Sequence, residues 1–289
     1  VLVLHGGAGV LAKRGYEPEI EHMAGLAKAA RERLNAGASA LDVAVETVKA
    51  LEASGLYVAG KGTAPNAAGR YELDASLMQG PGREAGAVSA LEGFLSPIEA
   101  ARAVLERTPH VLLAGAGAAA FAREERLAEV EDPDSYYTPA AAPDSRAIAT
   151  GTVGCVVLDQ EARLAAATST GGTLKKRWGR VGDSPIIGAG AWADERVAVS
   201  CTGQGEFFLR ANAAADVSAR VKYAGSSLEE AVTGSLGDVA RLGGEGGIIA
   251  VSADGSVSTQ FNSEGMKRAI LHADGRIEAG VRDVEAVAD

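Results

Sequence analysis

The sequence is poor in the residues that build disulfide frameworks and metal centres. Its two cysteines, Cys155 and Cys201, lie in apolar, strand-like contexts and belong to no Cys-x-x-Cys pair, and its four histidines are scattered without metal-ligand spacing. We therefore expect neither a disulfide framework nor a zinc site. We interpret both cysteines as small buried hydrophobic residues and the histidines, His5 among them, as structural.

Basic charge is also scarce. The 28 Lys and Arg residues are outnumbered by 38 Asp and Glu residues, which gives a formal net charge of -10 at pH 7. A nucleic-acid partner is therefore not expected, because binding to a phosphate backbone requires a concentrated basic face. We interpret the one short basic run, Lys175, Lys176 and Arg177, as a solvated loop.

Long hydrophobic runs are missing as well. No segment approaches the roughly 18 consecutive apolar residues of a membrane-spanning helix. The N-terminal stretch VLVLHGGAG has too few apolar residues for a signal peptide. We expect no membrane partner and a cytoplasmic location.

The chain does contain enough hydrophobic residues, 47% of its 289, to fill a sizeable core. Helical spacing of apolar residues predicts helices over 17–36, 39–54 with Ser39 as N-cap, 96–108, 116–130 and, as a pair, 205–242. Alternating segments predict strands over 71–78, 84–91, 152–159, 163–169 and 196–202, with three short strands over 246–252, 256–262 and 266–272. Meandering strands with helices in sequential pairs are typical of an α+β layered sandwich, here in a single domain spanning 1–289.

The periodicity fails between residues 130 and 150. This segment, within EDPDSYYTPAAAPDSRAIAT, carries Pro133, Pro139 and Pro143 among small polar and acidic residues. We predict a mobile, exposed linker over 130–150.

The linker ends at Gly151-Thr152, directly before a strand. On these residues alone, a strand entered through a flexible glycine is the simpler interpretation. Cleavage between Gly151 and Thr152, however, would give Thr152 a free α-amine beside its own hydroxyl. Such an amine can act as the general base for a threonine nucleophile, which is what a self-processing hydrolase requires.

Two later stretches contain groups that suit such a hydrolase. An aperiodic region brings together Thr170, Arg180 and Asp183. An arginine fork matches a carboxylate and an aspartate pairs with an ammonium, so the last two can hold an α-amino-acid head group. The sequence Thr202-Gly203-x-Gly205 ends a strand where backbone N–H groups and a hydroxyl can surround an oxyanion. In isolation, a surface ion pair is the simpler interpretation of Arg180 and Asp183, and an ordinary glycine-rich turn fits residues 202–205 equally well.

Taken together, these segments carry a family resemblance. HGGAG (5–9), GTVGCVVLD (151–159), ATSTGG (167–172), GRVGDSPIIGAG (179–190), SCTGQGE (200–206) and FNSEGM (261–266) closely resemble the plant-type L-asparaginase / isoaspartyl peptidase family. This is a group of N-terminal nucleophile hydrolases. The likeness is ordered, dense and spans nearly the whole chain.

The resemblance implies a specific architecture and life history. It implies a four-layer αββα sandwich made as an inactive precursor that cleaves itself between Gly151 and Thr152. The products would be an α chain of residues 1–151 and a β chain of residues 152–289, which stay associated and pair into an (αβ)2 dimer. No organic cofactor is implied.

The resemblance also implies a role for each candidate residue. Thr152 would be the nucleophile and, through its freed amine, the base, with Thr170 orienting its hydroxyl. Thr202 and Gly203 would form the oxyanion hole. Substrate would be held at its α-carboxylate by Arg180 and at its α-amine by Asp183, with a backbone contact from Gly205. The substrates would be L-asparagine and β-aspartyl dipeptides.

The chain departs from the family pattern at two places. Many members read Phe-Asn-Ala-Gly where this chain has Tyr57-Val58-Ala59-Gly60, and Val58 cannot supply the hydrogen bonds of that Asn. The family often has Asn-Lys where this chain has Lys175-Lys176-Arg177-Trp178, a change at the rim of the expected pocket. Members also commonly bind a structural sodium ion through backbone carbonyls, here around residues 52–60, and such ligation leaves no side-chain signature.

Other functions have weaker support. Gly115-x-Gly117-x-x-Ala120 outlines a dinucleotide-binding turn, but the linker stands where a second strand should follow. The stretch 55–62 has phosphate-loop spacing except that Gly62 replaces the final Ser or Thr. HGGAG is similar to an esterase oxyanion loop, but no Gly-x-Ser-x-Gly occurs. Within the superfamily, a glycosylasparaginase, a threonine endopeptidase or a homologue that never cleaves remain as alternatives.

Overall fold

The computed structural model describes residues 1–11, 14–140, 151–282 and 284–288. Its helices are α1 (Glu17–Asn35), α2 (Ala40–Ser54), η1 (Gly60–Gly62), α3 (Pro97–Arg107), α4 (Gly115–Glu124), α5 (Pro133–Tyr136), α6 (Gly205–Ala211), α7 (Ala213–Ala219), η3 (Arg220–Ala224) and α8 (Leu228–Arg241). Its strands are β1 (Leu2–His5), β2 (Leu73–Gln79), β3 (Glu84–Leu91), β4 (Leu112–Ala114), β5 (Val153–Leu158), β6 (Leu164–Thr170), β7 (Ala191–Ala193), β8 (Val197–Gly203), β9 (Gly246–Ser252), β10 (Val257–Phe261), β11 (Arg268–Leu271), β12 (Ile277–Gly280) and β13 (Val284–Ala288).

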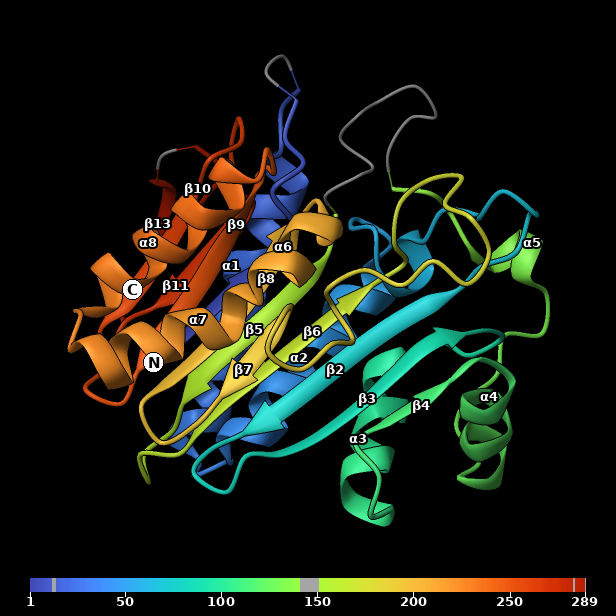
Figure 1. Ribbon diagram of the computed structural model, residues 1–289, viewed down its shortest axis with the longest axis horizontal. Coiled ribbons are helices and arrows are strands. Elements are labelled where there is room, and N and C mark those ends of the chain that lie inside the picture. The colour runs from blue at the N-terminus through green and yellow to red at the C-terminus, as the bar shows by residue number, and fades with distance from the viewer. Residues whose placement is uncertain (12–13, 141–150, 283, 289) are drawn as a thin grey trace.

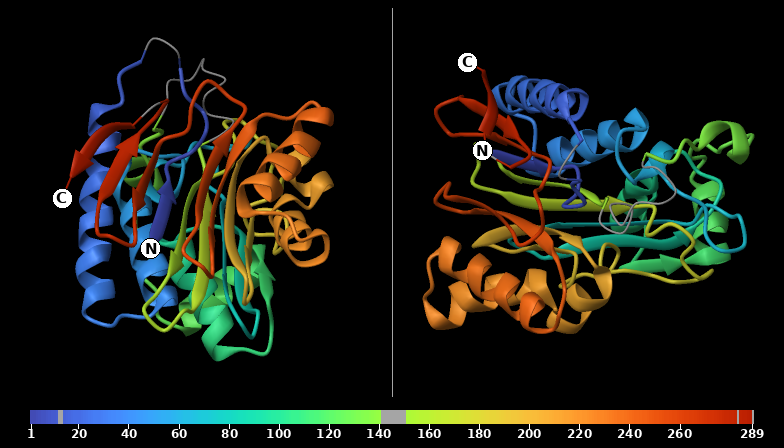
Figure 2. Two further views of the ribbon diagram at one scale, coloured as in Figure 1. Left: turned by 90° about the vertical axis from the view of Figure 1, so that its left-hand side faces the viewer. Right: turned by 90° about the horizontal axis from the view of Figure 1, so that it is seen from above.

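The described strands form two sheets stacked face to face. The larger sheet has nine strands in the order β13-β12-β11-β1-β5-β6-β2-β3-β4, and the smaller has four in the order β10-β9-β8-β7. Helices α1, α2 and α3 cover the outer face of the larger sheet, and α6, α7 and α8 cover that of the smaller, as the view from above shows (Figures 1 and 2). The predicted α+β fold with four αββα layers is confirmed.

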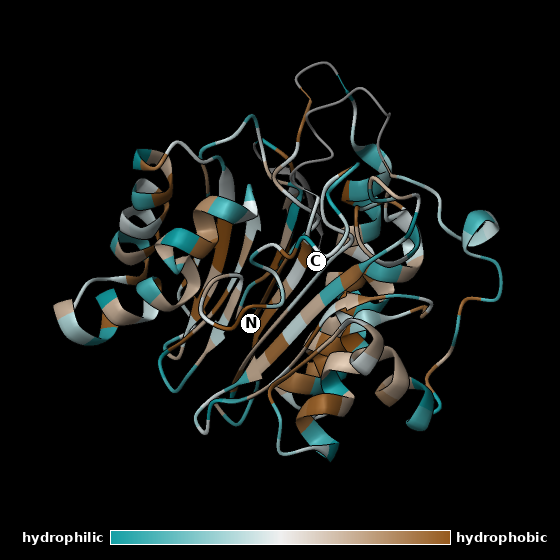
Figure 3. Cartoon of the chain, turned by 45° about the vertical axis from the view of Figure 1, so that its right-hand side comes forward, coloured by the Kyte–Doolittle hydropathy of each residue, from teal (hydrophilic) through white to brown (hydrophobic). Residues whose placement is uncertain are grey.

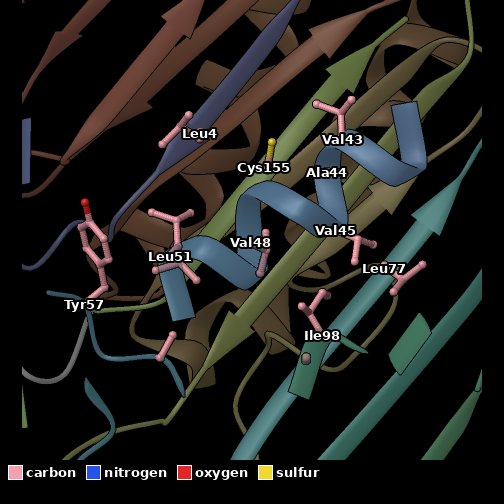
Figure 4. Packing of buried hydrophobic residues seen from close by; sticks show 14 of the residues in the cluster. Leu4, Val43, Ala44, Val45, Val48, Leu51, Tyr57, Leu77, Ile98 and Cys155 are labelled. Atoms are coloured by element: carbon pink, nitrogen blue, oxygen red, sulfur yellow. The ribbon is translucent and has the colours of Figure 1, made fainter. Parts of the chain in front are cut away.

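Three apolar cores hold these layers together. The first joins α1, α2 and α3 to the larger sheet, the second lies between the two sheets, and the third joins the smaller sheet to α6, α7 and α8. In the first core, Val45, Val48 and Leu51 of α2 pack toward β5 and β2 (Figure 4). Hydrophobic residues are concentrated in the central strands, and hydrophilic residues are found on the surrounding helices and loops (Figure 3).

Local sequence signals account for the main elements. Ser39 caps α2 by accepting a hydrogen bond from the Asp42 backbone N–H, and α3 begins at Pro97. The predicted helix over 116–130 ends early, because α4 stops at Glu124. The three-residue strands β4 and β7 were not predicted, and neither were β12 and β13. No helix in the described ranges is long and apolar enough to cross a membrane.

The first part of the predicted linker is largely exposed, as expected for residues 131–135, but it contains a short helix and one buried side chain. Residues 133–136 form the short helix α5, and Tyr137 is buried with its ring stacked on that of Tyr71. Thr138 and Ala140 then donate backbone hydrogen bonds to Lys61 and Gly62. The stacking of Tyr137 on Tyr71 joins two distant segments and produces no periodic pattern in the sequence, so it could not be predicted. Residues 141–150 lie outside the described residues.

Candidate active site

Two neighbouring strand ends bring Thr152 and Thr170 together. Thr152 directly precedes β5, and Thr170 is the last residue of β6. The antiparallel register pairs Val153 with Ser169, so its continuation places the two threonines side by side. Both side chains are buried, with 5% and 4% of their residue surface exposed.

The Thr152 hydroxyl contacts two neighbouring hydroxyl groups. Thr152 Oγ1 donates to Thr170 Oγ1 at 3.2 Å, and Ser184 Oγ lies 3.5 Å from Thr152 Oγ1. Thr170 Oγ1 also accepts from the Gly172 backbone N–H at 3.0 Å and lies 3.5 Å from the carbonyl oxygen of Val58. Because Thr170 accepts a hydrogen bond from Thr152, at least one lone pair of Thr152 Oγ1 is available to an electrophile.

A small pocket opens beside this pair. It is lined by Gly151, Thr152, Thr170, Gly172, Thr173, Arg180, Gly182, Asp183, Ser184 and Gly203. Gly203 comes from the end of β8 in the smaller sheet, so the pocket lies where the two sheets meet. Its neighbour Thr202 is fully buried, and Thr202 Oγ1 has no hydrogen-bond partner among the described protein atoms.

The opposite side of the pocket carries charged groups. The Arg180 guanidinium makes a two-point hydrogen bond with the Glu206 carboxylate, at 2.9 and 3.0 Å. Gly205 begins α6 beside both charged residues of the pocket. A Cβ at this position would lie 2.8 Å from Asp183 Oδ1 and 3.0 Å from Arg180 Nη2. The arginine is therefore already arranged to bind a carboxylate.

The carboxyl group of Asp183 has unusual electrostatics. Its residue is 3% exposed, and Oδ2 has no hydrogen-bond partner in the described protein. Burial raises the pKa of Asp183 to about 7, against the opposing effect of the Arg180 charge, and the negative charges of Glu206 and Asp74 add to the rise. An ammonium group placed next to it would lower that pKa and supply the missing partner.

Comparison with known proteins decides the family. The family model described as "Asparaginase" matches residues 1–145 and 133–281. An isoaspartyl peptidase of Salmonella typhimurium is 43% identical, over 93% of this chain and 94% of its own. An isoaspartyl peptidase of Escherichia coli is 42% identical over 93% and 92%, and a human isoaspartyl peptidase/L-asparaginase is 38% identical over 97% and 96%. The chain belongs to the asparaginase family.

All the candidate residues of this asparaginase-family chain come to one place. The pocket is lined by Thr152, Thr170, Arg180, Asp183 and Gly203. Thr202 precedes Gly203 in the sequence, and Gly205 lies beside Asp183. Among the described residues, no group of three or more His, Cys, Asp and Glu side chains is arranged to hold a metal ion.

The basic run in this family member is not the solvated loop that we expected. Lys175 and Arg177 are exposed, but the Lys176 side chain is 1% exposed. Its ammonium donates to the Glu72 carbonyl oxygen at 3.1 Å and lies 3.9 Å from Glu72 Oε2 and 3.8 Å from Asp74 Oδ2. Two buried carboxylates from distant segments therefore require this cation, a pairing that local charge patterning cannot reveal.

Val58 packs directly on the bond that the resemblance marks for cleavage. A Cβ at residue 151 would lie 2.3 Å from Val58 Cγ2, so glycine is the residue that fits there. The carbonyl oxygen of Val58 accepts the Gly171 backbone N–H at 2.9 Å. The backbone at this position thus supports the pocket, while its side chain forms an apolar wall instead of donating hydrogen bonds.

Sequence reasoning missed three side chains at this site. Ser184 lies near the nucleophile candidate, Glu206 pairs with Arg180, and His5 contacts the Thr152 carbonyl oxygen at 3.1 Å. Ser184 and Glu206 lie within the motifs 179–190 and 200–206, so their place in those motifs was a usable signal. His5 had only its place in HGGAG, more than 140 residues before Thr152 in the sequence.

Proposed function

We propose that this chain is a self-cleaving threonine amidohydrolase that converts β-aspartyl dipeptides and L-asparagine to L-aspartate. The observation that carries the proposal is the buried Thr152 hydroxyl, hydrogen-bonded to Thr170 in a pocket that also contains Arg180 and Asp183. The printed names of the relatives, isoaspartyl peptidase and isoaspartyl peptidase/L-asparaginase, support the same substrate class.

Activation begins with the chain's own backbone. Thr152 Oγ1 attacks the carbonyl carbon of Gly151, the C–N bond to Thr152 breaks, and the freed nitrogen takes up the hydroxyl proton. Water then hydrolyses the resulting ester, which releases residues 1–151 with a new carboxylate and regenerates the hydroxyl. Residues 152–289 now begin with a free α-amine on Thr152, the base that turnover requires.

Turnover uses the same hydroxyl on the substrate. The α-amine of Thr152 accepts the proton of its own Oγ1, which attacks the side-chain carbonyl carbon of the substrate. Charge develops on the carbonyl oxygen next to Thr202 and Gly203. The tetrahedral species expels ammonia or an amino acid, which takes the proton. Water hydrolyses the remaining aspartyl ester, with the amine as base, to give L-aspartate.

The charged side of the pocket selects the substrate. A small zwitterion places its α-carboxylate against Arg180 and its α-ammonium against Asp183. The Glu206 carboxylate occupies the guanidinium in the present structure, so the substrate carboxylate competes with it. This competition favours substrates that bind Arg180 with an α-carboxylate and Asp183 with an α-ammonium group at the same time.

Four further features belong to the proposal. The fragments associate into an (αβ)2 dimer, no organic cofactor takes part, and the enzyme acts in the cytoplasm. A structural sodium ion is bound by backbone carbonyls within residues 52–60.

The substrate assignment is tested by following aspartate release. Purified protein is incubated with a β-aspartyl dipeptide, with L-asparagine and with the α-linked form of the same dipeptide, alongside a Thr152→Ala variant. We expect aspartate from the first two only, and none from the variant. Release from the α-linked dipeptide at a comparable rate would instead indicate a peptidase without selectivity for the β-linkage, and no release from any substrate would contradict an active amidohydrolase.

A further inference from the structure

His5 lies in a buried polar layer between the two sheets. It is the last residue of β1, it is paired with Gly154 of β5, and its side chain has no exposed surface. Its Nδ1 lies 3.1 Å from the carbonyl oxygen of Thr152, and its Nε2 lies 2.9 Å from Ser200 Oγ on β8. One imidazole thus connects the nucleophile candidate to the opposite sheet.

The partners of His5 determine which of its nitrogens carries the proton. A carbonyl oxygen only accepts, so Nδ1 must donate to Thr152, and Nε2 of a neutral ring must then accept. Ser200 donates its proton to Nε2, and Ser200 Oγ lies 2.7 Å from Thr168 Oγ1. Thr168 Oγ1 also lies 3.3 Å from the Gly190 carbonyl oxygen, which is a second acceptor for its proton. The direction of the hydrogen bond is therefore fixed at Nδ1 of His5, where the partner is a carbonyl oxygen.

The ring remains neutral under ordinary conditions. Burial lowers the pKa of His5 to about 3, the contact with the Thr152 carbonyl opposes this, and the nearby Lys267 charge adds to the lowering. Protonation would require the Ser200 hydroxyl to accept from Nε2 and to turn its own proton toward Thr168.

The local sequence leaves room for this contact. A Cβ at residue 154 would lie 2.0 Å from Ser200 Oγ and 2.5 Å from His5 Nε2. Glycine in GTVGC therefore allows His5 and Ser200 to meet across the sheets, directly beneath Thr152. The side chains of His5, Thr168 and Ser200 are all fully buried, so this is an internal, fixed arrangement.

We propose that His5 is a positioning residue that holds the backbone of Thr152 in place after the chain is cut. The proposal rests on the proposed function, since cleavage turns Thr152 into a chain terminus. A terminal residue loses the restraint of the preceding peptide bond and frays unless it is tied down. His5 belongs to the 1–151 fragment, so its hydrogen bond to the Thr152 carbonyl supplies a restraint from outside the new chain.

The tautomer can be measured in the wild-type protein. Histidine-selective 15N labelling with NMR distinguishes a protonated Nδ1 from a protonated Nε2, and only four histidines contribute signals. We expect a neutral ring with the proton on Nδ1 in the processed enzyme. A proton on Nε2, or a charged ring at neutral pH, overturns the assignment without the need for any variant.

Two amide variants separate the two sides of the ring. Asn carries its amide nitrogen as many bonds from Cα as His Nδ1, so His5→Asn keeps the donor to Thr152. Gln reaches the position of Nε2 instead, so His5→Gln keeps a partner for Ser200 and loses the donor. We expect kcat of His5→Gln to fall by about 10²-fold, which is the scale of the loss when a reacting group is misplaced. We expect kcat of His5→Asn to fall by only about tenfold. KM should change little in both variants, because Arg180 and Asp183 are untouched.

A control and the wild type make the outcomes distinguishable. Ser235→Ala removes a buried hydrogen bond to the Ala213 carbonyl in the outer helical layer, so it lowers thermal stability without changing kcat. If kcat of His5→Gln equals that of wild type, or if kcat falls equally in the Asn and Gln variants, the positioning role is overturned and the proposed function stands. A wild-type chain that is not cut overturns the proposed function itself, and with it the restraint assigned to His5.

Discussion

Several buried side chains have a polar atom without a hydrogen-bond partner in the described protein. Two of these atoms, Asp183 Oδ2 and Thr202 Oγ1, belong to a residue that lines the pocket and to the neighbour of another, Gly203. An unsatisfied buried polar atom costs about 1–3 kcal/mol of folding free energy. Thr202 and Asp183 border the proposed substrate position, so a bound substrate can supply the hydrogen-bond partners that they lack.

The missing hydrogen-bond partner of Thr202 predicts that loss of its hydroxyl lowers activity but not stability. Thr202→Val keeps the shape and removes a hydroxyl that has no protein partner, so the melting temperature should not fall. Loss of an oxyanion donor should lower kcat by about 10²–10³-fold. Thermal unfolding and steady-state kinetics on the same samples check both. A large drop in melting temperature, or an unchanged kcat, would remove Thr202 from the oxyanion hole.

Asp183 predicts how substrate binding depends on pH. Its carboxyl has a raised pKa of about 7, so it binds a proton as the pH falls below that value and can no longer pair with an ammonium. KM for asparagine should therefore rise about tenfold per pH unit below 7. Asp183→Asn should show a high KM with no such dependence. The free energy of unfolding should also fall as the pH rises from about 4 to about 7, because the folded carboxyl binds its proton more tightly than the unfolded one.

At the scale of elements, the site depends on one long loop between β6 and β7. This loop contributes Gly172, Arg180, Asp183 and Ser184 to the pocket, and backbone hydrogen bonds tie it to the segment around residues 65–67. The buried Lys176 ammonium lies between this loop and the carboxylates of Glu72 and Asp74. The loop is irregular in structure, and its conformation is fixed by these contacts.

Removing that cation should loosen the loop. Lys176→Met leaves two buried carboxylates uncompensated, a change that costs about 3–5 kcal/mol of stability when a buried pair is broken. We expect a lower melting temperature and a raised KM, because Arg180 and Asp183 lie on the same loop. Lys175→Met, the exposed neighbour, is the matched control and should behave as wild type in both measurements. Similar behaviour of the two variants would show that the buried cation does not organise the site.

Elements and site residues were predictable to different extents. Helix α2 was predictable from its N-cap and its apolar periodicity. The site residues Thr152, Thr170, Arg180 and Asp183 were predictable because each lies in a short motif that shows its chemistry locally. Strands β4 and β7 are three residues long, too short for alternation to register. The burial of Lys176, the contacts of His5 and the Arg180 pairing with Glu206 all join segments far apart in sequence, so they depend on the tertiary fold.

At the scale of the whole molecule, the two proposed fragments are interleaved. In the larger sheet, β1 of residues 1–151 lies between β11 and β5 of residues 152–289, and β2 pairs with β6. Cleavage at Gly151 breaks no strand pairing in the described sheets. The fragments should therefore remain associated in native buffer and separate only on denaturation.

Cleavage between Gly151 and Thr152 is the central claim, and denaturing mass spectrometry tests it most directly. Purified protein and a Thr152→Ala variant are incubated at neutral pH and their intact masses recorded. The account predicts that the 29.3 kDa chain divides into two pieces whose masses place the cut before Thr152, while the variant stays whole. An intact wild-type chain, or a variant cut at the same bond, would contradict it.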